Sequence, residues 1–230
     1  MGPSSGGTSE AEPDWPPSAR WALWVTIVGI ALYIVLDVVG QLLPPHYSPI
    51  SQAESDLGVG PYGWLMDLNF IVRGILSLSF AYALYATWPT ASKRPNVGLA
   101  LIGAWGVGAF ILSVSTVTVS GPATTHGTVH NITAALAFLF VAIGELLVAF
   151  SMGPTSPWRA IRKYAWPLAI VTAVALLALT IGTGFPRIDA HYFGLLERVF
   201  IGFALLWVLI VSILLARSSP ERHRDRAAVR

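Results

Sequence analysis

Two histidines four residues apart are the pair in this chain whose spacing most suggests chemistry. His126 and His130 occur in the stretch SGPATTHGTVHNIT, where a polar segment passes into a long apolar run. Residues at i and i+4 share one face of a helix, so the two imidazoles could bind one metal ion. His191 or an outer-loop carboxylate could add a third ligand. Three protein ligands plus a water are typical of catalytic zinc, which lowers the pKa of that water to about 7.

The same residues also have a purely structural interpretation. A helix that enters a membrane begins with unpaired N–H groups, and Thr124 or Thr125 could cap them while the two histidines bond to neighbouring loops. Ser51 and Ser55 are conceivable nucleophiles, but serines in SPISQAESD are more typical of turns, and no GxSxG motif surrounds them. We assign no catalytic residue from these patterns.

Charged residues inside apolar segments form a second group. Asp37, Asp67 and the Glu197–Arg198 pair each lie five or six residues inside a predicted helix, which places them roughly 7–10 Å below one membrane surface. Each costs at least about 2.5 kcal/mol there unless it is paired or hydrated. We therefore predict one shared polar pocket below the outer loops. Its predicted lining residues are Asp37, Ser51, Glu54, Ser55, Asp56, Asp67, Asp189, Glu197 and Arg198.

The composition indicates the solvent in which these residues must be positioned. The chain is 54% hydrophobic and only 11% charged, whereas soluble domains carry about 25% charged residues. A helix needs about 20 apolar residues to cross a bilayer. Six segments qualify: Trp21–Leu43, Tyr62–Trp88, Val97–Val119, Gly127–Ser151, Tyr164–Thr183 and Tyr192–Ala216. The sequence thus predicts an all-α integral membrane bundle of six transmembrane helices.

The charge distribution predicts how this bundle is oriented. Lysines and arginines concentrate in two short loops and in the C-terminal segment, while the three opposite loops carry only Arg187. The positive-inside rule then puts both termini in the cytoplasm of a multi-pass protein of the inner cell membrane. We expect a disordered tail at 1–20, the transmembrane domain at 21–216 and a basic tail at 217–230. Because this basic excess follows the topology pattern, it does not indicate a nucleic-acid partner.

Three blocks carry a resemblance to a known family. They are YSPISQAESDLGVGPYGWLMDLNFIVRG in the first outer loop and second span, the THGTVH turn, and GLLERVFIGFALLW in the last span. Together, and in this order, they resemble the bacterial membrane family catalogued as domain of unknown function 998. The resemblance implies a six-helix membrane fold and brings no established activity.

These observations lead to three hypotheses about function. The first is binding of a lipid or other amphipathic small molecule at the outward pocket, with hydrolysis assisted by zinc at His126, His130 and His191. The second is a proton-coupled carrier or a sensor of pH or ligand, because histidines titrate near neutral pH and intramembrane acids mark proton paths. The third is a structural or assembly subunit of a membrane complex.

Overall fold

The computed structural model describes residues 15–43, 46–89, 92–153 and 158–218. Within these residues the chain forms six α-helices and one short 3₁₀ helix, and no strand. The elements are α1 (Pro17–Leu42), η1 (Glu54–Gly58), α2 (Gly63–Thr87), α3 (Asn96–Leu112), α4 (Thr125–Ser151), α5 (Trp158–Thr183) and α6 (Pro186–Arg217). The predicted all-α bundle of six helices is therefore confirmed.

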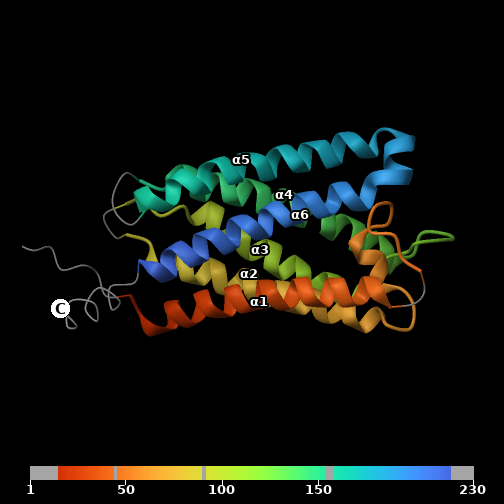
Figure 1. The fold of residues 1–230 in the computed structure, drawn as a ribbon, viewed down its shortest axis with the longest axis horizontal. Coiled ribbons are helices and arrows are strands. Elements are labelled where there is room, and N and C mark those ends of the chain that lie inside the picture. The colour runs from red at the N-terminus through yellow and green to blue at the C-terminus, as the bar shows by residue number, and fades with distance from the viewer. Residues whose placement is uncertain (1–14, 44–45, 90–91, 154–157, 219–230) are drawn as a thin grey trace, which may run out of the picture.

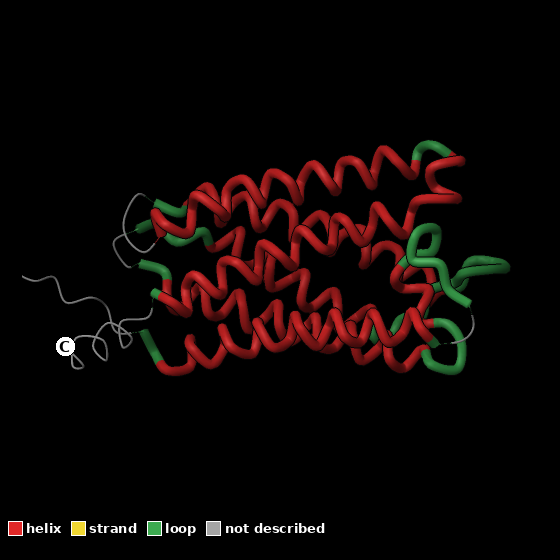
Figure 2. Tube along the Cα trace, viewed as in Figure 1, coloured by secondary structure: helices red, strands yellow, loops and turns green. Residues whose placement is uncertain are grey.

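The helices alternate in direction along the chain (Figure 1), and their contacts form a closed ring. Each helix packs against the next along the chain, and α1 closes the ring against α6. The α1–α2, α3–α4 and α5–α6 connections gather at one end, which we call the loop end (Figure 2). The other end, called the terminal end, holds the start of α1 and the end of α6. Consecutive helices that run antiparallel produce this arrangement.

Five of the helices are long and apolar enough to cross a membrane, namely α1, α2, α4, α5 and α6. The remaining one, α3, is apolar but has 17 residues. Large apolar side chains such as Val28, Ile34 and Phe150 point outward and are exposed. An apolar exterior is expected of a protein whose solvent is lipid.

Aromatic side chains fill the centre of the ring and hold its helices together. The ring of Phe80 on α2 meets Trp207 on α6 edge-on, with centroids 5.6 Å apart. Trp88 and Trp158 stack at 4.5 Å nearer the terminal end. Such pairs add about 0.5–1.5 kcal/mol each beyond the area that they bury. The indole of Trp207 also donates a 2.8 Å hydrogen bond to the carbonyl of Ala165 on α5.

Three predicted helix boundaries are wrong. The fifth helix already includes Trp158, six residues before its predicted start at Tyr164. The third helix ends at Leu112 rather than Val119. Ser113 follows it, and its hydroxyl donates to the carbonyl of Phe110 at 2.8 Å, an alternative to continued helix. The sixth helix begins at Pro186 instead of Tyr192, so the predicted 184–191 loop is mostly helix. Proline fits the first helical position because the N–H that it lacks would have no hydrogen-bond partner within the helix there.

The predicted tails lie largely outside the described residues. Residues 1–14 and 219–230 are not described, so the structure does not test the expectation for those parts. In the described remainder, α1 starts at Pro17 and α6 continues to Arg217, so helix extends into both predicted tails.

Candidate functional site

The loop between α1 and α2 folds back onto the first turns of α6. The backbone N–H of Leu195 donates to the carbonyl of Ile50 at 2.9 Å. Gly194 makes this approach possible, because a Cβ at that position would collide with the carbonyl oxygens of Pro49 and Gln52. A glycine where two backbones meet is the expected solution.

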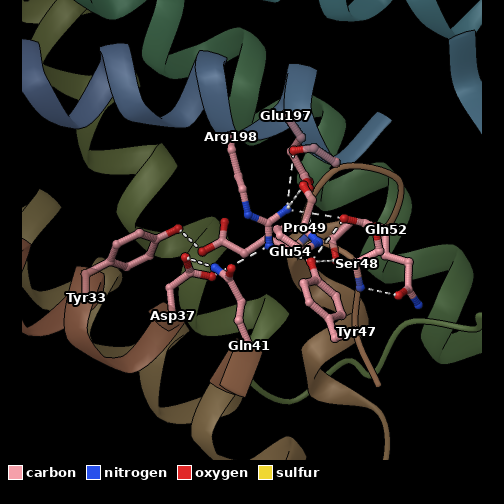
Figure 3. Close-up of polar contacts among 12 residues, drawn as sticks. Tyr33, Asp37, Gln41, Tyr47, Ser48, Pro49, Gln52, Glu54, Glu197 and Arg198 are labelled. Atoms are coloured by element: carbon pink, nitrogen blue, oxygen red, sulfur yellow. Dashed lines mark hydrogen bonds and ion pairs between the residues drawn. The ribbon is translucent and has the colours of Figure 1, made fainter. Parts of the chain in front are cut away.

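Arg198 of α6 organises this loop (Figure 3). Its Nη1 donates to the carbonyls of Pro49 and Gln52, both at 3.2 Å, and to that of Gly194 at 3.3 Å. Its Nη2 donates to the hydroxyl of Tyr47, whose own O–H reaches the carbonyl of Ala53 at 2.7 Å. The planar guanidinium supplies several donors in a fixed fork, which is why one side chain can bind so many loop carbonyls.

The loop places Glu54 at a buried position among the helices. Glu54 is 3% exposed, and its backbone N–H donates to Oε2 of Glu197 at 2.6 Å. Its own Oε1 accepts a short hydrogen bond from the hydroxyl of Tyr33 on α1. Two carboxyl groups from distant parts of the sequence are therefore buried together.

Asp37 completes the polar group on the α1 side. Its Oδ2 accepts a 2.6 Å hydrogen bond from Nε2 of Gln41, and its Oδ1 lies 3.7 Å from Nη2 of Arg198. Figure 3 shows Asp37 and Tyr33 reaching from α1 toward the centre, where Arg198 arrives from α6. The structure brings Asp37, Glu54, Glu197 and Arg198 near one another.

A groove of about 300 Å³ runs along the contact between α1 and α6. The part of the groove nearer the loop end, which we call its upper end, is polar and is lined by Tyr33, Asp37, Glu54 and Arg198. The rest of the lining is mainly aliphatic. We call this the α1–α6 groove, and its lining residues are Ile30, Tyr33, Ile34, Asp37, Glu54, Arg198, Ile201, Gly202, Leu205, Leu206 and Leu209. A polar end joined to an apolar channel matches the two halves of an amphipathic molecule.

A second, smaller space lies on the inner side of Glu54. It measures about 20 Å³ and is called the inner cavity. Its lining residues are Glu54, Ser55, Phe70, Arg73, Leu112, His130, Ala134, Phe138, Glu197 and Ile201. Glu54 and Ile201 line both spaces, so these two residues lie between the groove and the cavity.

Burial raises the pKa of the loop residues Tyr47, Glu54 and Asp56. Loss of solvent raises the pKa of Glu54, and the nearby Asp37 carboxylate raises it further, although Arg73 and Arg198 act in the opposite direction. Burial likewise raises the pKa of Asp56 and that of Tyr47, whose hydroxyl stays protonated beside Arg198. The loop thus presents proton donors as well as acceptors to the site.

The three histidines of the zinc hypothesis have different surroundings. His130 is buried, and its Nδ1 lies 2.6 Å from the carbonyl oxygen of Ser115. His191 is exposed and bonds to the carbonyl of Arg187 in its own helix, at 2.9 Å. His126 is exposed at the start of α4, one residue after Thr125, with Thr124 capping the Gly127 N–H at 3.0 Å. Among the residues described, no three His, Cys, Asp or Glu side chains form a group able to hold a metal ion.

The other predicted pocket residues are spread over the loop end. Ser55 lines the inner cavity. Asp56 lines a separate pocket of about 150 Å³ between α1, the loop and α2. The backbone N–H of Ser51 bonds to the hydroxyl of Ser48 at 3.4 Å. Asp67 is half-buried on α2, and Asp189 is exposed in the first turn of α6, and neither lines the groove or the inner cavity.

Sequence reasoning missed several members of the site. Tyr33 and Tyr47 carry no charge, so nothing in the hydropathy pattern marked them. Gln41 follows Asp37 by four residues, a helical spacing that could have indicated the pair. Arg73 was visible as a mid-membrane charge, and only the fold places it on the inner cavity.

The fold and the site are those of a multi-pass membrane protein with buried ionisable groups. A comparison with protein families matches residues 27–214 to the family described as "Protein of unknown function (DUF998)". Because the match covers most of the chain, this protein belongs to that family, as the three blocks in its sequence predicted. Searches of curated proteins and of solved structures gave no match.

Proposed function

We propose that this protein binds a lipid or another amphipathic small molecule in the α1–α6 groove. The observation that carries the proposal is the division of the groove into a charged upper end and an aliphatic remainder. Ligand sites typically combine an apolar lining with a few convergent polar groups, in volumes of about 300–1,000 Å³. The groove is at the lower end of this range, which suits a headgroup and part of one chain.

The position of the groove supports entry from the bilayer. Its aliphatic residues belong to α1 and α6, two of the helices able to span a membrane. Ile34 and Leu206 line it and are also exposed on the lipid-facing exterior. Charges inside membrane segments are costly, and their presence favours a functional role.

Lipid retention tests this proposal. The purified protein is offered phosphatidylglycerol or phosphatidylcholine in mixed micelles, and native mass spectrometry measures the bound fraction. We expect Leu205→Trp, which fills the aliphatic part, to lower retention while Leu177→Trp, on the exposed face of α5, leaves it unchanged. Equal retention by all three proteins would contradict the proposal. Loss of folded yield in step with lost retention would favour the structural or assembly role.

A proton-coupled carrier or a pH or ligand sensor is the second candidate. It is favoured by the buried carboxyl groups of Glu54 and Glu197 next to Arg73. Reconstitution into vesicles containing a pH-sensitive dye distinguishes a carrier from a sensor. A proton-coupled carrier would change the pH of the vesicle lumen when a gradient of its substrate is imposed, whereas a sensor would not.

Hydrolysis assisted by zinc at His126, His130 and His191 is an untested extension of the first proposal. Zinc measured in the purified protein and in a His126→Ala, His130→Ala variant decides it. Stoichiometric zinc in the wild-type protein that is absent from the folded variant would support the hydrolysis hypothesis. The absence of zinc from both proteins would exclude the hypothesis.

The membrane topology also remains a proposal. We propose that α3 crosses the bilayer with the other five helices and that both termini are cytoplasmic in an inner cell membrane. At about 1.5 Å per residue, α3 is about 25 Å long, somewhat short of the hydrocarbon core. Lys93, Arg94 and Arg162 at the terminal end support the orientation. The chain lacks cysteine, so Ser120→Cys and Asn96→Cys can be tested with an impermeant maleimide, which should label only the first from outside.

A further inference from the structure

The inner cavity contains a charged group that the helices leave without a partner. Arg73 is 1% exposed, and neither its Nε nor its Nη2 has a hydrogen-bond partner. Its guanidinium lies 4.9 Å from the ring centroid of Phe70 and lines the cavity. Arginine stays charged in proteins, and a buried charge without hydrogen bonds is strongly unfavourable. Something in the cavity must therefore solvate these two donors.

The size of the cavity identifies its contents. About 20 Å³ exceeds the 10–15 Å³ that a single water needs and is far too small for an organic ligand. Around it, Glu54 and Glu197 offer acceptors, Arg73 offers donors, and His130 is buried at the rim. A water with two to four polar partners is stable in such a place.

The charges around the cavity do not balance. Three carboxyl groups, from Asp37, Glu54 and Glu197, face two guanidinium groups, from Arg73 and Arg198. If every group were ionised, the buried set would carry a net charge of −1. An uncompensated buried charge is avoided by binding or releasing a proton. One additional proton makes the set neutral.

The hydrogen bonds indicate where that proton resides. Arg198 lies 3.7 Å from Asp37 and binds the loop carbonyls, so Asp37 has its own cation. No ion pair within 4.0 Å joins Glu54 or Glu197 to a described cation. Glu197 accepts the Glu54 backbone N–H, while Glu54 faces the Tyr33 hydroxyl. The carboxyl groups without a cation, Glu54 and Glu197, are where the extra proton is stabilised.

From this arrangement we infer that the inner cavity is a proton-binding site, in which water beside Arg73 and one proton are shared between Glu54 and Glu197. We infer further that its proton occupancy is coupled to occupancy of the α1–α6 groove. This second part rests on the proposed function. Glu54 and Ile201 line both spaces, and Tyr33, which donates to Glu54, also lines the groove.

The coupling follows from charge. A proton on Glu54 or Glu197 makes the upper end of the groove less negative, so an anionic headgroup near Arg198 binds more tightly in the protonated state. By linkage, binding of that ligand must favour uptake of the proton. The groups that face Glu54 are Tyr33 and Asp37 on α1, Tyr47 in the loop before η1, Arg73 on α2, and Glu197 and Arg198 on α6. His130 of α4 faces the same cavity.

Infrared difference spectroscopy tests the proton site without any ligand. The wild-type protein in detergent, titrated with acid and base, should show the C=O stretch of a protonated carboxylic acid that shifts in D₂O. Glu54→Gln and Glu197→Gln each preserve side-chain shape, and each should change this band. Glu145→Gln is the matched control, since Glu145 is another fully buried carboxyl that lines neither space. A wild-type band that does not titrate, or that only Glu145→Gln alters, would overturn the inference.

The coupling needs a second measurement, of binding against pH. Fluorescence anisotropy of NBD-labelled phosphatidylglycerol gives its affinity, and we expect that affinity to fall about tenfold as the pH rises through the titration of the band. In Glu54→Gln the affinity should become nearly independent of pH. A titrating band with pH-independent lipid affinity would overturn the coupling alone. A titrating band with no lipid binding at any pH would leave the proton site standing and contradict the proposed function.

Discussion

Glu54 donates its backbone N–H to the carboxylate of Glu197 at 2.6 Å, although 143 residues separate the two along the chain. This bond ties the loop of η1 to the first third of α6 and sets the position of the Glu54 side chain. The next residue, Arg198, donates to the loop carbonyls of Pro49 and Gln52. Two adjacent residues of α6 therefore hold the loop between α1 and α2.

The close approach of Gly194 to the loop predicts a strong effect of a small substitution. Gly194→Ala places a Cβ against the carbonyl oxygens of Pro49 and Gln52, so the loop must move. We expect a destabilisation of about 1–3 kcal/mol, measured by thermal unfolding in detergent. Gly202→Ala is the matched control on the same helix, because nothing lies within 4 Å of its Cβ. It should be neutral or stabilising by up to about 1 kcal/mol, and equal effects of both changes would refute the explanation.

Arg198→Lys should release the loop while keeping the positive charge. Lysine cannot reproduce the guanidinium fork, so hydrogen bonds to the loop carbonyls are lost, each worth about 1.5–3 kcal/mol. We expect hydrogen exchange to accelerate at least about tenfold at the amides of Leu195 and Glu54, which bond across the loop–helix contact. The amide of Thr128, bonded to Thr124 in α4, should exchange at its wild-type rate. Uniform acceleration would indicate global unfolding instead.

The raised pKa of Glu54 predicts how stability depends on pH. A carboxyl with a raised folded-state pKa stabilises the folded protein fully below its ordinary value of 4.5, and this stabilisation is lost as the pH rises through the folded-state pKa. The melting temperature should therefore fall as the pH rises above about 4.5. In Glu54→Gln the fall should be smaller, and Asp56 is one of the groups that contribute to what remains. Asp189→Asn, at an exposed site, should keep the wild-type profile, and a wild-type profile in Glu54→Gln would exclude this residue as the source.

The two histidines at i and i+4 should respond very differently to replacement. His130→Ala removes the partner of the Ser115 carbonyl and leaves a buried gap, so we expect a loss of about 2–3 kcal/mol. His126→Ala, at an exposed position, should stay within about 0.5 kcal/mol of wild type. Thermal unfolding measured with and without a chelator checks both values. The zinc hypothesis would be supported if both variants lost the same stability and the chelator caused an equal loss in the wild-type protein.

The sequence alone determined the fold class, and it did so because hydropathy is a local property. Each apolar run had to satisfy its own backbone hydrogen bonds, so six helices followed from six runs. Depth was harder to obtain in this way: counting from the predicted helix ends placed Asp37, Glu197 and Arg198 at one level, but α6 begins at Pro186, six residues before its predicted start. The blocks that carried the family resemblance could likewise be found along the chain, and the family match confirmed them.

Tertiary structure decided which of these residues meet. Rotation of each helix about its axis depends on packing, and it turned Glu197 toward the inner cavity while Asp67 lines neither space. Folding of the loop depends on Gly194 and Arg198, residues far from it in sequence, and this brought Glu54 inside. His126 and His130 share a helix, but His126 is exposed, whereas His130 is buried against the Ser115 carbonyl and the ring of Phe70. These choices follow from contacts between distant segments, which no local pattern records.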